Sequence, residues 1–144
     1  MDPVWSDDPS KPYVRYEGHE RFSLEKFKNA FERVFLPMAE YYIAHGEYVV
    51  MRPPGVCPEE LAPNDDYYQF LSQVWTYVSD HKKVRNNMKI MFELANEPVR
   101  FNGSYQDVSN YFQGIVDQIR GNCMNIIWVP GLSWQMEYRM YSQK

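Results

Sequence analysis

Three short apolar runs alternate with three amphipathic patterns along this chain, and that alternation limits the possible folds more than any other feature. The apolar runs begin near Tyr48, Lys89 and Asn125. Each has the length and residue types of a buried strand. Near-continuous apolar strands separated by helices are typical of a parallel sheet that helices cover. We therefore predict an α/β fold.

The first amphipathic pattern begins after a plausible N-cap at Ser23 and ends at Gly46. Pro37 lies inside it and predicts a kink or a break into two helices, because proline removes a backbone donor. Helical spacing predicts that one apolar face turns inward, formed by Leu24, Phe27, Phe31, Val34, Met38 and Tyr41 or Tyr42.

The second and third patterns have clearer ends. Asn64 or Asp65 can cap the second helix. Ser104 and Asp107 form a capping signature for the third, which ends at Gly121. Their predicted buried stripes are Phe70, Leu71, Val74, Trp75 and Val78 in the second helix, and Val108, Tyr111, Phe112, Ile115, Val116 and Ile119 in the third.

Right-handed crossovers place the C-terminal ends of all three strands at one edge of the sheet. Ligands of parallel α/β sheets bind at that edge. The residues expected there are Arg52, Asn96, Glu97, Gly131 and Trp134. Of the three histidines, only His19 could reach this edge, since His45 and His81 follow helix C-termini on the far side.

The stretch "IMFELANEPV" ends an apolar strand in Asn96, Glu97 and Pro98. A carboxylate at a strand end can exchange protons with a bound substrate, and the neighbouring amide can bind a hydroxyl group. Pro98 predicts an extended backbone at Glu97. The alternative is that Asn-Glu-Pro simply turns the chain.

Composition excludes some classes of partner. The net charge of −4 and the pI near 5.4 argue against nucleic acid, which would require a basic patch. No apolar run has the roughly 18 residues that a membrane span requires. The polar, proline-rich start of the chain does not resemble a signal peptide. Aromatic residues make up 17%, which suits either a sugar-contacting surface or a tyrosine-rich core.

Cys57 and Cys123 fit no metal-binding spacing. The predicted sheet places them at opposite ends of its strands, so a disulfide between them is not expected.

"IMFELANEP" resembles the fourth-strand signature of glycoside hydrolase family 5, the cellulase family of retaining (β/α)8 barrels. "YVVMRPPGVCP" and "NIIWVPGLSWQ" extend the resemblance over roughly residues 24–136. The resemblance implies a partial (β/α)8 TIM barrel whose three strands correspond to strands three to five. It also implies that Glu97 is the general acid/base and that Asn96 binds the sugar 2-hydroxyl.

The activity implied is that of an endo-β-1,4-glucanase. Glu97 would protonate the leaving oxygen while a second carboxylate attacks the anomeric carbon, and would then deprotonate water. The chemistry requires no metal or organic cofactor, and the substrate would be a β-glucan or a related polysaccharide. Family resemblance further implies a secreted or extracellular protein.

The sequence departs from the family pattern at several positions. The family places its nucleophile after a seventh strand, which has no counterpart here, and Arg52 stands where many members carry a histidine motif. Arg52 is therefore expected to pair with Glu97, to bind substrate or to form a structural salt bridge. Other carboxylates weighed as a second acid, and expected to be solvated loop charges, are Glu59, Glu60, Asp65, Asp66 and Glu137.

Aromatic residues divide between platform and core. Trp134, just past the last strand, is the best candidate for stacking on a sugar ring, with simple packing as the alternative. Trp75 and Trp128 are expected in the core. The predicted substrate-binding residues are therefore Asn96, Arg52, Trp134 and His19.

Three strands cannot close a barrel that requires eight. Their inner face would remain apolar and uncovered, and such patches drive association. We therefore predict one partial catalytic domain over residues 1–144, loop-rich over 1–22, completed by self-association or by a complementary barrel fragment. The alternative to an enzyme is a non-catalytic carbohydrate-binding or self-assembling half-barrel.

Overall fold

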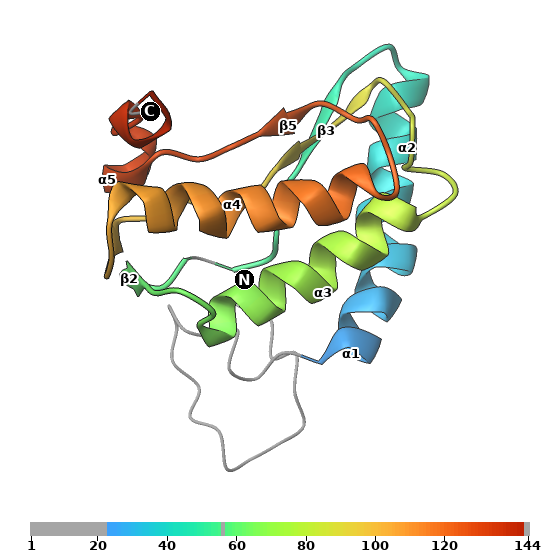
Figure 1. Ribbon diagram of the computed structural model, residues 1–144. Coiled ribbons are helices and arrows are strands. Elements are labelled where there is room, and N and C mark those ends of the chain that lie inside the picture. The colour runs from blue at the N-terminus through green and yellow to red at the C-terminus, as the bar shows by residue number, and fades with distance from the viewer. Residues whose placement is uncertain (1–22, 56, 143–144) are drawn as a thin grey trace.

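The computed structural model describes residues 23–55 and 57–142. Its helices and strands alternate along the chain, as Figure 1 shows. In chain order they are α1 (Leu24–Ala30), the π-helical turn η2 (Phe31–Phe35), α2 (Leu36–Ala44), β1 (Val49–Met51), β2 (Glu60–Leu61), α3 (Asp66–Asp80), β3 (Ile90–Glu93), β4 (Arg100–Phe101), α4 (Tyr105–Arg120), β5 (Ile127–Trp128), α5 (Leu132–Gln135) and the 3-10 turn η3 (Arg139–Tyr141).

The main sheet has the order β1-β3-β5, and all its strands are parallel. Val50 pairs with Met91, and Glu93 pairs with Trp128. In Figure 1, α3 and α4 lie below the strands, with the C-terminal strand ends on the left near α5 and β2. The predicted α/β alternation and the parallel sheet are confirmed.

Helices α3 and α4 form the covered side of the sheet. Asp65 caps α3 by accepting a hydrogen bond from the Tyr68 amide at 2.7 Å. Ser104 and Asp107 complete the predicted capping box of α4. The predicted stripe of α3 is buried throughout, and that of α4 is buried except for the partly exposed Val116. Capping and periodicity therefore place both helices correctly.

The first helix differs from its prediction. The π-helical turn η2 precedes Pro37, and the Leu36 amide bonds to the Phe31 carbonyl, five residues earlier. The wider turn adds one residue, so the inward face rotates after Phe31. Leu36 and Ala39 are buried, whereas the predicted core residues Val34, Met38, Tyr41 and Tyr42 are exposed. Pro37 distorts the helix as predicted, but the predicted face beyond Phe31 is wrong.

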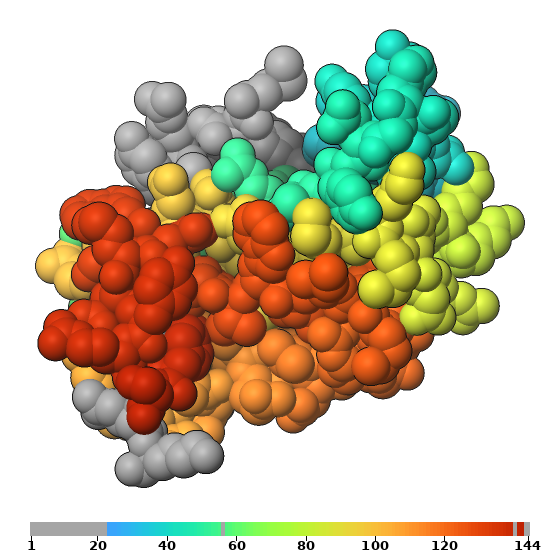
Figure 2. Space-filling model, turned by 90° about the horizontal axis from the view of Figure 1, so that it is seen from above, coloured from blue at the N-terminus to red at the C-terminus, as the bar shows by residue number. Residues whose placement is uncertain are grey.

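The other side of the sheet has no helix over it among the described residues. Figure 2 looks down on this side, where side chains of the strands lie exposed. Along each strand, alternate residues face it, among them Val50, Met91, Glu93, Ile126 and Trp128. Trp128 is 49% exposed, so its predicted core position is wrong. Within residues 23–55 and 57–142, the predicted apolar face is present and no helix covers it.

Candidate active site

The loops that follow the three strands meet at the C-terminal edge of the sheet. Arg52 follows β1, Asn96 and Glu97 follow β3, and Trp134 lies in α5 after β5. The structure therefore places four of the five predicted site residues at this edge. His19 lies outside the described residues.

Asn96 is the buried polar residue of this edge, with 8% of its surface exposed. Its Oδ1 accepts a hydrogen bond from Arg52 Nη1 at 2.8 Å, and its Nδ2 donates to the Gly55 carbonyl at 3.4 Å. A side-chain amide has two donor hydrogens and two acceptor lone pairs, so one of each stays available. Arg52 and Gly55 thus fix which end of the amide points in which direction.

Arg52 therefore acts on Asn96, which was not among the roles expected for it. No ion pair joins Arg52 to Glu97 in residues 23–55 and 57–142, and its hydrogen-bond partner there is the neutral amide of Asn96. An arginine that donates to an amide oxygen stays charged and makes a stronger hydrogen bond than a neutral donor. The structural salt bridge and the contact with substrate, the other roles expected for Arg52, stay predictions.

Glu97 projects from the loop after β3 and is exposed to solvent. Its backbone is left-handed, with φ at 53°, so the extended conformation predicted from Pro98 is wrong. The residues on either side explain the difference. The Asn96 carbonyl accepts from the Cys57 amide, and the Pro98 carbonyl accepts from the Trp134 amide. These bonds hold a conformation that a residue before proline ordinarily avoids.

The loop of Glu97 is hydrogen-bonded to loops on both sides. Towards the β1 loop, the parallel pair β2–β4 matches Glu60 with Arg100 and Leu61 with Phe101. Towards the β5 loop, the Ser133 amide donates to the Val99 carbonyl at 2.9 Å. The strand order of the sheet thus continues into the loops above it, and Glu97 sits in the middle one.

Trp134 is 60% exposed, so packing into the core does not account for it. Its amide donates to the Pro98 carbonyl at 3.1 Å, one residue beyond Glu97 in the chain. Ser133, Trp134 and Gln135 all have positive φ, as Glu97 does. Strained backbone of this kind gathers at functional sites more than elsewhere.

Most of the carboxylates weighed as a second acid are engaged locally. Glu59 pairs with Arg100, and Asp65 caps α3 and accepts from the Tyr111 hydroxyl at 2.9 Å. Hydrogen bonds from Arg139 lower the pKa of Glu137 to about 2. Glu60 and Asp66 are exposed.

Two polar residues of this region were not singled out from the sequence. Glu93 lies on the uncovered face of β3, and its Oε1 accepts a hydrogen bond from Gln135 Nε2 at 2.6 Å. The acidic residue inside an otherwise apolar strand was the signal for Glu93. Gln135 carried none, because its role depends on the turn that brings it back to β3.

The cysteines are buried and unpaired, as predicted. Burial raises the pKa of the Cys57 thiol to about 12. Within the described ranges, no three histidine, cysteine, aspartate or glutamate side chains gather as metal ligands would. None of the helices described is long and apolar enough to cross a membrane.

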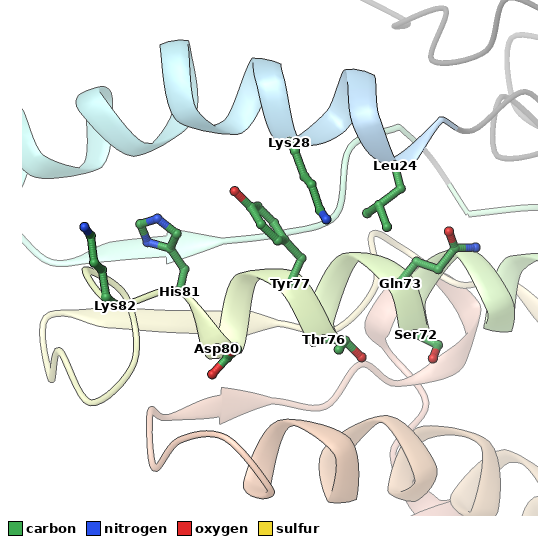
Figure 3. Close-up of a pocket in the computed structure, with 9 residues that line it drawn as sticks. All are labelled: Leu24, Lys28, Ser72, Gln73, Thr76, Tyr77, Asp80, His81 and Lys82. Atoms are coloured by element: carbon green, nitrogen blue, oxygen red, sulfur yellow. The ribbon is translucent and has the colours of Figure 1, made fainter.

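A separate groove of about 570 Å³ lies between α1 and α3. Figure 3 shows Lys28 and Tyr77 facing each other across it, with the Lys28 ammonium 5.0 Å from the centre of the Tyr77 ring. Its lining comes from α1, the C-terminal half of α3 and the residues just after it. None of the candidate site residues at the strand ends lines this groove.

The chain belongs to the cellulase family, glycosyl hydrolase family 5, whose family model matches residues 24–143. Solved endoglucanase structures share its fold. The endoglucanase Cel5A of Thermotoga maritima superposes with a TM-score of 0.57 at 15% identity, covering 85% of this chain and 39% of that one. A family 5 lichenase from Caldicellulosiruptor sp. F32, in a complex of a variant with cellotetraose, gives a TM-score of 0.53 at 19% identity, covering 83% and 38%.

A further endoglucanase gives a TM-score of 0.54 at 18% identity, covering 74% of this chain and 34% of that one. At these identities the likeness shows the fold. The chain spans 34–39% of the length of these three structures, so the barrel is incomplete here. No curated protein matches the chain.

Proposed function

We propose that this chain carries the acid/base half of an endo-β-1,4-glucanase site, in a single partial catalytic domain over residues 1–144. The observation that carries the proposal is the exposed Glu97 carboxylate at the C-terminal strand edge, beside the oriented amide of Asn96. Membership of family 5 supports a glycoside hydrolase. The substrate would be a β-glucan or a related polysaccharide.

In the proposed reaction, Glu97 protonates the glycosidic oxygen as the bond to the anomeric carbon breaks, and later takes a proton from the attacking water. Asn96 binds the 2-hydroxyl with its remaining donor and acceptor, and Arg52 keeps the amide in that orientation. Trp134 offers an exposed ring for stacking. His19 stays a predicted substrate-binding residue.

Retention requires a second carboxylate about 5–5.5 Å from the first. Glu59, Asp65 and Glu137 each have a local partner. We therefore propose that the nucleophile comes from a further part of the barrel, supplied by another segment or by another copy.

The test is reducing-sugar release from soluble β-glucan by this chain, compared with a Glu97→Gln variant. Where another copy of the chain supplies the nucleophile, a loss of about 100-fold or more is expected in the variant, because Gln cannot transfer the proton. Where the nucleophile lies on another segment, neither chain turns over substrate. Glu60→Gln is the matched control, since it removes an exposed carboxylate from the neighbouring loop. Equal turnover by Glu97→Gln and the control would contradict the assignment.

A non-catalytic, self-assembling half-barrel is the second candidate, favoured by the uncovered face that includes Val50, Ile126 and Trp128. Further apolar residues are exposed on η2 and α2, among them Phe35, Met38 and Tyr41. Association would remove this surface from water. Light scattering that gave a stable, compact monomer would contradict association, and turnover that depends on Glu97 would favour the enzyme over this candidate.

The location proposed for the protein is extracellular, in keeping with a polysaccharide substrate too large to enter a cell. Fractionation of cells that express the natural gene, followed by detection of the protein in medium and lysate, tests it.

A further inference from the structure

The turn that carries Trp134 is left-handed over three successive residues. Ser133 has φ 51° and ψ 56°, Trp134 has φ 55° and ψ 44°, and Gln135 has φ 68°. Each such residue is less favourable than a right-handed one, because Cβ approaches the following carbonyl oxygen. A turn of this kind persists only where other contacts hold it.

Backbone contacts hold its first part. The Ser133 and Trp134 amides donate to the carbonyls of Val99 and Pro98. At the base of the turn, Leu132 and Glu137 exchange amide-to-carbonyl hydrogen bonds of 3.1 and 3.0 Å. These bonds attach the turn to the Glu97 loop, but none of them involves Gln135.

Gln135 is held by its side chain. Its Nε2 donates to the Glu93 carboxylate at 2.6 Å, and both side chains are half-buried. Glu93 belongs to β3, whose backbone is fixed on both sides by β1 and β5. A hydrogen bond to a charged acceptor is about twice as strong as a neutral one. The last left-handed residue is thus tied to the central strand of the sheet.

We infer that Glu93 and Gln135 are positioning residues that hold the turn of the exposed Trp134 against the loop of Glu97, so that the Trp134 ring can receive a pyranose ring of the substrate. The part of the inference that concerns the sugar rests on the proposed function. The part that concerns the hydrogen bond between Gln135 and Glu93, called the tie below, rests on geometry alone. Neither residue touches substrate. Their contribution is the orientation of an exposed ring that would otherwise share the freedom of its loop.

The tie is tested first without sugar, by ¹⁹F NMR of the whole chain labelled with 5-fluorotryptophan. Trp134→Phe assigns the Trp134 signal, and the buried Trp75 reports whether the fold is intact. Gln135→Glu places two carboxylates together and is expected to shift or broaden the Trp134 signal. The exchange Glu93→Gln with Gln135→Glu restores one donor and one acceptor, and is expected to return the signal to its original position.

An unmoved Trp134 signal in Gln135→Glu would overturn the inference, as would a signal that the exchange fails to restore. In both cases an unchanged Trp75 signal shows that the fold is intact. If the Trp75 signal moves in Gln135→Glu, the Trp134 signal is compared in Gln135→Leu instead, which removes the donor without adding charge.

Cellotetraose titration then tests the sugar. The original chain and the exchange variant are expected to show a Trp134 shift with similar affinity. Gln135→Glu is expected to bind about tenfold more weakly, which corresponds to the loss of one hydrogen bond. Equal affinity in all three would overturn the inference and leave the proposed function standing. Absence of any shift in the original chain would instead contradict the proposed sugar edge.

Discussion

Two buried asparagines lie at opposite edges of the same sheet, and they are used differently. Asn125, before β5, is fully buried, and its Nδ2 lies within 2.9–3.1 Å of the carbonyls of Val84, Asn87 and Ile90. Its Oδ1 accepts from the Asn86 amide at 2.8 Å. Asn96, at the other edge, keeps one donor and one acceptor available. Asn125 uses its hydrogen-bonding capacity within the fold, whereas Asn96 keeps part of its own.

The difference between the edges extends to the backbone. Positive φ values at Glu97, Ser133, Trp134 and Gln135 gather at the edge of Asn96, while Asn86 has the corresponding value at the edge of Asn125. Asn86 tolerates that conformation better than most residues because its side chain is short and polar, and its Oδ1 accepts from the distant Met124 amide. At the edge of Asn96, the strained backbone belongs to residues that adopt a positive φ less readily than asparagine, as is common at functional sites.

The largest effect on stability is expected from Asn125→Ala. The substitution leaves three carbonyls and one amide without their shared partner, and we expect a loss of about 2–3 kcal/mol in the free energy of unfolding. Urea denaturation followed by circular dichroism measures it. Asn102→Ala, in an exposed loop at the other edge, is the control and should stay within about 0.5 kcal/mol. Similar losses in both variants would erase the contrast between the edges.

Asn96→Ala is expected to affect oligosaccharide binding more than stability. Arg52 is exposed and can bond to water instead, so the stability loss should be about 1 kcal/mol. The decrease in oligosaccharide binding or turnover should be larger, in free energy, than this loss of stability. Isothermal titration with cellotetraose, beside urea denaturation, separates the two quantities. A loss of stability as large as that of Asn125→Ala would make Asn96 a structural residue.

Arg52→Met sharpens the comparison further. Removal of an exposed side chain should change stability by less than about 0.5 kcal/mol, but it frees the Asn96 amide to rotate. The ¹⁵N-resolved side-chain signals of Asn96, assigned with Asn96→Asp, should shift and exchange faster with solvent. Arg52→Lys is the control that keeps a charged donor. Signals unchanged in Arg52→Met would show that Gly55 alone orients the amide.

The smallest effect concerns the buried Cys57 thiol between pH 7 and 9. The pKa of Cys57 is raised to about 12 by burial, and burial also raises the pKa of Tyr67 beside it. A raised pKa means that the protonated thiol stabilises the fold fully below its unfolded pKa near 9, and that this contribution is lost as pH rises from 9 towards 12. Stability should therefore change by less than about 0.5 kcal/mol from this thiol between pH 7 and 9.

Urea midpoints at pH 7, 9 and 11 check this expectation, with Cys57→Ala as the reference that lacks the thiol. A stability that rises between pH 9 and 11 in the original chain, relative to the reference, would show the opposite sign.

The sequence was sufficient for α3, α4 and the three main strands, because caps and apolar periodicity are local signals. It failed where a distant contact decides the local conformation. Glu97 departs from the preference set by Pro98 because both neighbouring loops bond to its flanks. The two-residue strands β2 and β4 have no periodic signal, and they form only because the sheet brings their loops together.

The candidate site divides in the same way. The strand order located Asn96, Glu97 and Trp134, since strand ends converge whatever the loops do. It could not assign Arg52 to Asn96 or connect Gln135 to Glu93, because a side chain's partner depends on loop geometry. The change of buried face after Phe31 was missed because a π-helical turn leaves no mark on the composition of a helix.

The pairing of β2 with β4 has a consequence for anyone who would re-engineer these loops. Glu60 is in register with Arg100, and the neighbouring Leu61 is fully buried. Inserting one residue in either loop slips this register and turns Leu61 to the opposite side. The two loops are therefore one exchangeable unit, and a graft that brings new substrate contacts from a relative has to transplant both at matched lengths.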